Sequence, residues 1–236
     1  MAAMRPSVDN RSTGLKVLLA VGVGVAAATV LIVGNQLLRG TSTPDVVPQP
    51  VVDLAGIPES RTVLGKPEAK VTLIEYADQQ CPGCRYYTLN VFPSVVNQFV
   101  RNGKVKMEYR GFPFKGSDSV KALRFLLAAG RQDRLWQLQE ALYRYQGREN
   151  SGWITDELIR SLASKIQGLN VTQLFTDAQS SAITQEADGA EAKASAAGIP
   201  GTPTFFIQIG KAQPYNLNVA LDPAQFRAAL NDALNG

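Results

Sequence analysis

The sequence predicts an α/β fold in which a helical insertion separates two halves that contain strands. A β-branched, apolar pattern at 70–77 indicates a buried strand, and a Cys-x-x-Cys pair that opens a helix follows it directly. About 80 residues from Asp118 to Ala197 show helical periodicity. A last strand pattern at 202–210 is followed by a hairpin and by an amphipathic helix at 222–234.

The first half consists of a strand, a helix and a second strand. The helix begins at Pro82, because proline suits the first turn, where its missing N–H would have no partner. Apolar spacing carries this helix to about Asn102, and Pro93 predicts a kink inside it. The second strand, at 103–114, follows a glycine turn.

The insertion, placed at about 117–197, is expected to contain only helices. Thr155 is a suitable N-cap for one of them. Residues 144–149 are expected to form a solvated helix end. The predicted helices cover 119–130, 134–146, 155–166, 170–181 and 183–198.

The N-terminal part predicts a membrane anchor. Residues 17–34 carry no charge over about the length that spans a bilayer. Basic residues precede them, which favours a cytoplasmic N-terminus at 1–16 and a transmembrane helix at 17–38. The alternative is a cleaved signal peptide, whose apolar region is usually shorter. The rest of the chain is then extracytoplasmic: a Pro-, Ser- and Thr-rich tether at 39–60 and a domain at 61–236.

Composition excludes several classes of site. The chain has no histidine, so Ser-His-Asp triads and histidine-bearing zinc sites are excluded. Its two cysteines cannot complete a four-cysteine zinc site, and only a metal shared between chains stays possible. The net charge of +4 includes no basic run, so no nucleic-acid partner is expected. No metal or organic cofactor is indicated.

The two cysteines are best explained as a reactive dithiol. Cys81 and Cys84 are separated by two residues. A disulfide that closes so short a loop constrains the unfolded chain very little, which disfavours a structural role. Cys81 stands at a helix N-terminus, where free N–H groups stabilise a thiolate, whereas Cys84 is one turn further in.

Longer stretches carry a resemblance to a known family. The Cys-x-x-Cys after a first strand, together with "GIPGTPTFF" before a late strand, resembles the thioredoxin-fold disulfide oxidoreductases of the DsbA type. More narrowly, "VLGKPEAKVTLIEYADQQCPGC" and "GWITDELIRSLASKIQGLN" resemble the membrane-anchored, exported members from Gram-positive bacteria. The resemblance covers about residues 60–235 and implies a thioredoxin fold with a helical insertion between the Cys-x-x-Cys half and the cis-proline half.

The resemblance also implies roles for individual residues. Cys81 is the attacking cysteine and Cys84 the resolving one, and Glu75 transfers a proton toward Cys84. The other interpretation of Glu75 is a carboxylate at a strand end that faces solvent. The substrate-binding residues are Thr202, Pro203, Pro82 and Gly83, with Pro203 in the cis form and the backbone N–H and C=O of Thr202 open to a substrate strand.

Two departures from the family pattern concern the neighbours of Cys81. Its motif contains no histidine, so thiolate stabilisation is expected to depend on helix N–H groups, with Arg85 close by. Gln79 and Gln80 stand where relatives often have an aromatic residue, which predicts a more polar surface facing the substrate.

Together these features predict a membrane-tethered protein disulfide oxidoreductase that donates its Cys81–Cys84 disulfide to exported cysteine-containing proteins. A membrane redox partner is expected to reoxidise it. An extracytoplasmic reductase or isomerase is the first alternative, and a redox-inert peptide-binding module the second.

Overall fold

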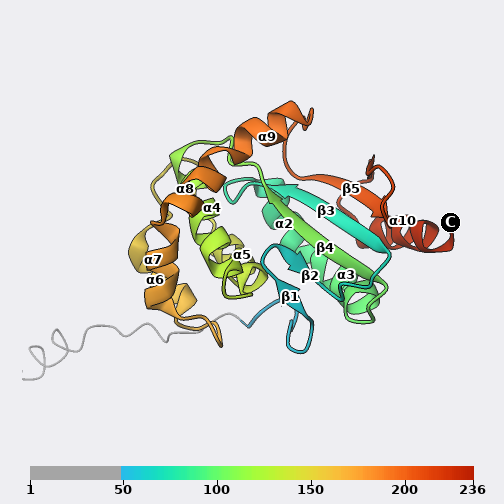
Figure 1. Ribbon diagram of the computed structural model, residues 1–236, viewed down its shortest axis with the longest axis horizontal. Helices are drawn as coiled ribbons and strands as arrows, with labels where there is room; N and C mark the ends of the chain where they lie inside the picture. Colours follow the sequence, from blue (N-terminus) through green and yellow to red (C-terminus); the bar gives the residue numbers. More distant parts are fainter. Residues whose placement is uncertain (1–48) are drawn as a thin grey trace, which may run out of the picture. The chain divides into compact units, whose positions relative to one another are not determined.

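The computed structural model describes residues 49–236, and its strands form one mixed sheet (Figure 1). The central strands β3 and β4 run parallel, and every other neighbouring pair is antiparallel. The sheet order is β1-β2-β4-β3-β5-β6. The strands are β1 (Glu59–Ser60), β2 (Val63–Leu64), β3 (Val71–Ala77), β4 (Val105–Gly111), β5 (Thr204–Ile209) and β6 (Tyr215–Asn216).

The helices confirm an insertion between β4 and β5. Thr155 caps its third helix, because its side chain accepts a hydrogen bond from the N–H of Leu158. The last predicted helix is divided at Gly189. The described helices are α2 (Pro82–Asn90), α3 (Phe92–Val95), the π-helical turn η1 (Val96–Val100), α4 (Ser117–Gly130), α5 (Leu135–Arg144), α6 (Asp156–Ala163), α7 (Val171–Ala178), α8 (Ser181–Asp188), α9 (Ala190–Ala196) and α10 (Pro223–Asn235).

The predicted kink near Pro93 is confirmed. Helix α2 ends at Asn90, and α3 starts two residues later. Val91 still donates its N–H to the carbonyl of Tyr87, whereas Pro93 has no N–H to continue the ladder. The helix is therefore interrupted at Val91, before the turns that lead to β4.

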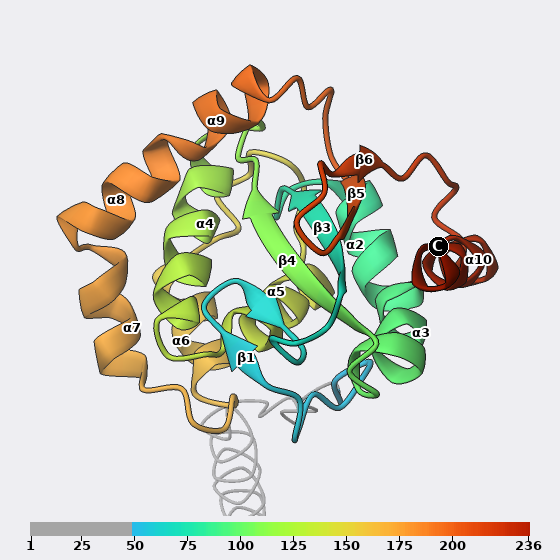
Figure 2. The ribbon, with the colours of Figure 1, turned by 45° about the vertical axis from the view of Figure 1, so that its right-hand side comes forward.

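The two faces of the sheet carry different layers (Figure 2). On one face, the rings of Tyr87 in α2, Phe205 in β5 and Phe226 in α10 pack together, with centroids 4.4–5.3 Å apart. On the other face, Ile74 and Tyr76 of β3 belong to a smaller apolar cluster with Ala194 of α9. The alternation along β3 follows from the two-residue period of a strand, and all seven of its residues are buried.

The domain begins earlier than the sequence predicted. The tether was expected to reach residue 60, but the compact unit starts at Pro50. Val52 and Leu54 are buried in the main core, and the N–H of Val51 donates to Glu140 Oε1 at 2.7 Å. Two apolar side chains of this Pro-rich stretch are therefore removed from water in the domain core.

The predicted anchor at 17–38 and the cytoplasmic segment at 1–16 lie outside the described residues. Within residues 49–236, no helix is long and apolar enough to cross a bilayer.

Candidate active site

The cysteine pair lies where β3 passes into α2. Cys81 is the N-cap of α2, Pro82 occupies its first turn, and no side chain caps the helix. The N–H of Cys81 donates to the carbonyl of Asp78, and its own carbonyl accepts from the N–H of Arg85. The first N–H groups of the helix are therefore free to face the sulfur of Cys81.

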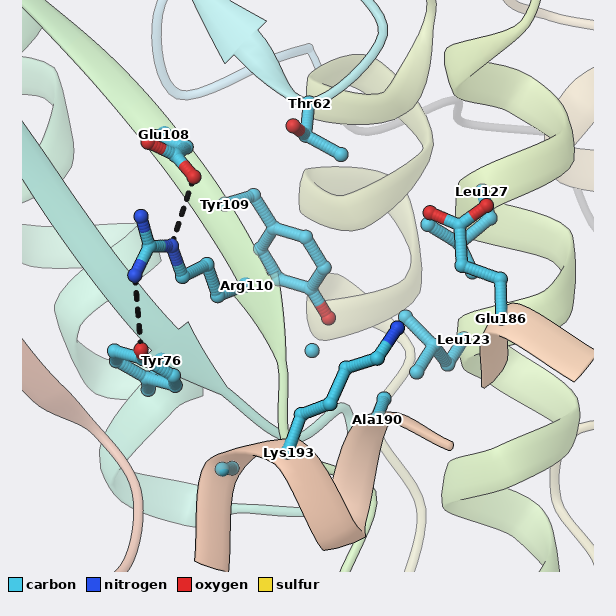
Figure 3. A pocket seen from close by; sticks show the side chains of 12 residues that line it. Thr62, Tyr76, Glu108, Tyr109, Arg110, Leu123, Leu127, Glu186, Ala190 and Lys193 are labelled. Atoms are coloured by element: carbon cyan, nitrogen blue, oxygen red, sulfur yellow. Dashed lines mark hydrogen bonds and ion pairs between the residues drawn. The ribbon is translucent and has the colours of Figure 1, made fainter. Parts of the chain in front are cut away.

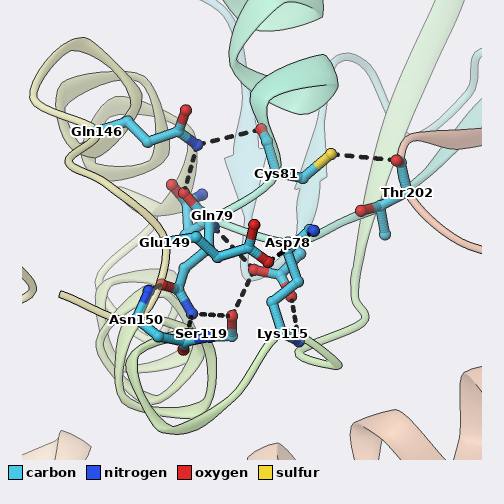
Figure 4. Close-up of polar contacts among 10 residues, drawn as sticks. Asp78, Gln79, Cys81, Lys115, Ser119, Gln146, Glu149, Asn150 and Thr202 are labelled. Carbon is cyan, nitrogen blue, oxygen red and sulfur yellow. Dashed lines mark hydrogen bonds and ion pairs between the residues drawn. The ribbon is translucent and has the colours of Figure 1, made fainter. Parts of the chain in front are cut away.

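The loop before β5 faces the same sulfur. The Thr202–Pro203 peptide is cis, as the resemblance implied. The Cys81 thiol donates to the backbone carbonyl of Thr202 at 3.1 Å (Figure 4). That carbonyl was expected to be open to a substrate, but in this dithiol state it accepts from Cys81. The four predicted substrate-binding residues thus come from two distant segments that meet at the cysteines.

Cys81 has the properties of an attacking cysteine. The hydrogen bond from the Cys84 thiol, the Thr202 side chain and the N–H groups of Cys84 and Gly83 together lower the pKa of Cys81 to about 6, although burial opposes this shift. Only 5% of the residue is exposed. The lowered pKa brings the thiolate of Cys81 within reach at neutral pH without any histidine, while the structure shows the protonated thiol that donates to Thr202.

Cys84 has the opposite properties. It is fully buried, and burial raises its pKa well above the ordinary value. The neighbouring Cys81 and Glu75 raise it further, because like charges disfavour a second anion. Both thiols are free in this structure. Of the two sulfur-bearing residues, Cys81 keeps a small exposed area of 5%, whereas Cys84 has none.

Glu75 lies beneath the cysteines and away from solvent. On β3 it alternates with Ile74 and Tyr76, so it shares the face of Leu73 that is covered by the main core. Glu75 is fully buried, and no hydrogen bond from a described residue reaches either carboxyl oxygen. Burial raises the pKa of Glu75 to about 8, against the opposing effect of the Gln139 amide. The alternative of a solvent-facing carboxylate is wrong.

Two expectations about neighbours of Cys81 are also wrong. The guanidinium of Arg85 points to the insertion, where its Nε donates to the carbonyl of Tyr143 at 2.9 Å. Gln79 and Gln80 are 2% and 1% exposed, so they do not form a polar surface for substrates. The tight turn between β3 and α2 directs both glutamines inward, which the linear pattern does not reveal.

Asp78 and several residues of the insertion form a polar network that the sequence analysis missed. Asp78 is buried, and its Oδ1 accepts from Ser119 Oγ at 2.6 Å and from the N–H of Gln80 at 2.8 Å. The side chain of Gln80 donates to Ser119 Oγ and to Asn150 Oδ1. Gln146, expected at a solvated helix end, instead donates to the carbonyls of Gln79 and Cys81. No motif marks these residues, because their contacts with the insertion join positions 39–70 apart.

A separate pocket of about 440 Å³ lies on the other face of the sheet (Figure 3). Arg110 is one of the residues that line this pocket. Its guanidinium donates to Glu108 at 2.7 Å and to the Tyr76 hydroxyl at 3.0 Å. None of the predicted site residues lines this pocket. Its lining comprises Thr62, Tyr76, Glu108, Tyr109, Arg110, Gly111, Leu123, Leu127, Glu186, Ala190, Lys193 and Ala194.

Known proteins are similar to this chain in both sequence and fold. The sequence profile of the family described as Thioredoxin matches residues 58–232. A "Probable disulfide bond formation protein D" from Bacillus anthracis is 29% identical over 158 residues, which cover 64% of this chain and 71% of that protein. The "Disulfide bond formation protein D" of Bacillus subtilis strain 168 is 25% identical over 151 residues, or 63% of this chain and 68% of that protein.

The fold agrees with these similarities. The crystal structure of oxidised BdbD from Bacillus subtilis matches with a TM-score of 0.65 at 22% identity, over 75% of this chain and 94% of that one. The family match covers most of the chain, and the cysteine pair stands at the helix start that the fold provides. The chain therefore belongs to the thioredoxin family and is a DsbA-like thiol–disulfide oxidoreductase.

Proposed function

We propose that this oxidoreductase donates the Cys81–Cys84 disulfide to exported proteins that contain cysteines. The observation that carries the proposal is the asymmetry of the pair: the pKa of Cys81 is lowered to about 6, while that of the buried Cys84 is raised. A stabilised Cys81 thiolate favours the dithiol state and so makes the disulfide oxidising. The names of the two Bacillus relatives, disulfide bond formation protein D, support the same direction.

In the first step, a substrate thiolate attacks Cys81 Sγ of the disulfide. A bond forms between the substrate sulfur and Cys81, the Cys81–Cys84 bond breaks, and Cys84 leaves as a thiolate. Glu75 supplies a proton to Cys84, because burial keeps this carboxyl group protonated near neutral pH. Cys84 thus becomes the neutral thiol that its buried position favours.

In the second step, another thiolate of the substrate attacks the substrate sulfur of the mixed disulfide. A substrate disulfide forms, and Cys81 leaves as the thiolate stabilised by the start of α2. Two electrons have then passed from the substrate dithiol to the cysteine pair. Thr202, Pro203, Pro82 and Gly83 form the surface on which the substrate chain lies, with the backbone of Thr202 pairing with it as an added strand.

Turnover requires an oxidant for the reduced pair. A membrane redox partner linked to quinone takes the two electrons from Cys81 and Cys84 and restores the disulfide. The segment at 17–38 holds the enzyme in the cell membrane as a single-pass anchor, with residues 1–16 in the cytoplasm and the catalytic domain outside. Alkaline phosphatase fused after residue 60 tests this orientation, because the fusion is active only if that residue is exported.

The mechanism is tested by two single cysteine variants of the full-length chain. Cys81→Ser removes the attacked sulfur and should abolish oxidation of a reduced substrate. Cys84→Ser removes the resolving sulfur and should accumulate mixed disulfides between Cys81 and substrates, visible on non-reducing gels. Normal turnover in either variant would contradict the assigned roles.

A further inference from the structure

One side of helix α5 faces the segment that carries the dithiol. Gln139, Tyr143 and Gln146 follow each other at i, i+4 and i+7, so they share a side of the helix and of the turn that continues it. The N–H of Gln146 donates to the carbonyl of Tyr143 at 3.3 Å, which keeps Gln146 in register. Tyr143 and Gln146 hydrogen-bond to different carbonyls between Asp78 and Cys81, and the Gln139 amide acts against the raised pKa of Glu75.

Gln146 has the most direct contact. Its side-chain Nε2 donates to the carbonyl of Gln79 at 2.8 Å and to the carbonyl of Cys81 at 3.1 Å (Figure 4). Both hydrogens of one amide are thus used on the backbone of a single turn. The Cys81 carbonyl also accepts from the N–H of Arg85, which belongs to the first turn of α2.

Tyr143 and Arg85 add a second tie between the same elements. The Tyr143 hydroxyl donates to the carbonyl of Asp78 at 3.1 Å, and that carbonyl also accepts the N–H of Cys81. Arg85, on α2, returns a hydrogen bond to the carbonyl of Tyr143. The backbone of Cys81 is therefore held from both sides by groups whose own positions depend on α5.

We propose that Gln146 is a positioning residue for the cysteine pair: its amide holds the turn from Gln79 to Cys81 so that the N–H groups at the start of α2 point at Cys81 Sγ. These N–H groups are among the causes of the lowered pKa of Cys81. If this turn were mobile, its N–H groups would be less well aligned with Cys81 Sγ. A hydrogen bond weakens steeply as the angle at its hydrogen falls away from linear. The insertion thereby contributes to thiolate stability, in the place of the histidine that the motif lacks.

The test compares variants of the full-length chain by two measurements at the sulfur. The pKa of Cys81 comes from the pH dependence of its alkylation rate, and the reduction potential from equilibration with glutathione. Gln146→Leu keeps most of the volume and removes both donors. Gln146→Ser keeps this half-buried position polar and uncharged but is too short to reach either carbonyl, so it decides the question if the leucine variant does not fold. Gln98→Leu is the matched control, because Gln98 is exposed and its side-chain amide donates to Ser94, four residues earlier.

We expect Gln146→Leu to raise the pKa of Cys81 by about half a unit to one unit, since one to two neutral hydrogen bonds are lost. The potential should become more negative by about 15–30 mV, which is the same threefold to tenfold change expressed as a potential. Gln146→Ser should raise the pKa by a similar amount, because the same two hydrogen bonds are lost without a change in charge. The control should match the wild type.

If both Gln146 variants keep the wild-type pKa and potential, the proposal is overturned. If these variants then differ from the wild type only by a lower melting temperature, Gln146 merely ties the insertion to the sheet. The proposal rests on Cys81 as the attacked sulfur of the proposed function, but not on the direction of electron flow. A strongly reducing wild-type potential would overturn the donor role, while the difference between the wild type and the variants would still test Gln146.

Discussion

Gly83 lies so close to Pro203 that no side chain fits between them. A Cβ atom on Gly83 would be 2.9 Å from Cδ of Pro203 and 3.7 Å from Cys81 Sγ. The proline ring cannot move aside as a flexible side chain would. The glycine of the Cys-x-x-Cys motif therefore lets the loop before β5 approach the reactive sulfur.

Gly83→Ala should displace this loop and weaken the contact between Cys81 and Thr202. Overpacking of this kind destabilises a protein by about 1–3 kcal/mol, and we also expect slower thiol–disulfide exchange with a model peptide. Gly201→Ala is a matched control in the same loop, because nothing lies within 4 Å of its added Cβ atom. Melting temperatures and exchange rates of the two variants test the prediction, and equal behaviour would contradict it.

The reactivity of Cys81 should follow a pKa of about 6. Since the thiolate is the reactive form, the alkylation rate should be half-maximal near that pH and lose about tenfold for each unit below it. Cys84→Ala should shift the midpoint upward, because the thiol of Cys84 is the largest cause of the lowered pKa. A midpoint near the ordinary thiol value, about 8.5, in the unmodified chain would contradict this environment.

Glu75 should reduce the stability of the fold as the pH rises. Its pKa is about 8 in the folded chain and near 4.5 when unperturbed, so the folded state keeps a proton that the unfolded chain loses between these values. The free energy of unfolding then falls with rising pH over that window. The gain in melting temperature from Glu75→Gln should be small at pH 5 and grow toward pH 8.

A half-buried glutamate, Glu59, provides the control for Glu75. Burial raises the pKa of Glu59 to about 7, and Glu59 Oε1 accepts from the N–H of Trp136, away from the cysteines. Glu59→Gln should therefore change the pH dependence of stability in the same sense but leave the rate of substrate oxidation unchanged, whereas Glu75→Gln should lower that rate. Equal rates in the two variants would remove Glu75 from the mechanism.

The boundary of the domain is also open to test. Leu54 is 7% exposed in the main core, although the sequence placed it in the tether. Leu54→Ala should cost about 2 kcal/mol or more, because it leaves a cavity. Pro58→Ala, at an exposed position of the same stretch, should be nearly neutral. Chemical denaturation of both variants measures the difference, and a neutral Leu54→Ala would return the boundary to residue 61.

Much of the fold could be predicted because its signals are local. The β-branched run before Cys81, the proline at the start of α2 and the Thr155 cap each act within a few residues, and each appears as predicted. Strands β1 and β2 were missed, since each has two residues and offers no period to detect. Pro93 also indicated the break in the helix, because the missing N–H is a property of the residue itself.

The surroundings of the site were less predictable, since they depend on contacts between distant segments. Gln80 and Gln146 look like surface residues in the sequence, yet both bind across the boundary between the sheet and the insertion. Arg85 was expected near the sulfur because it is close to Cys81 in sequence, but its Nε donates to the carbonyl of Tyr143 instead. Polar side chains have several possible partners, and only the tertiary fold selects among them.

The reduction potential of the Cys81–Cys84 pair tests the central claim most directly. It is measured by equilibrating the full-length chain with mixtures of reduced and oxidised glutathione. A disulfide donor whose Cys81 has a pKa of about 6 should have a potential between roughly −180 and −120 mV, the range of oxidising members of this fold. A value near about −270 mV, like that of thioredoxin, would contradict the donor role and indicate a reductase instead.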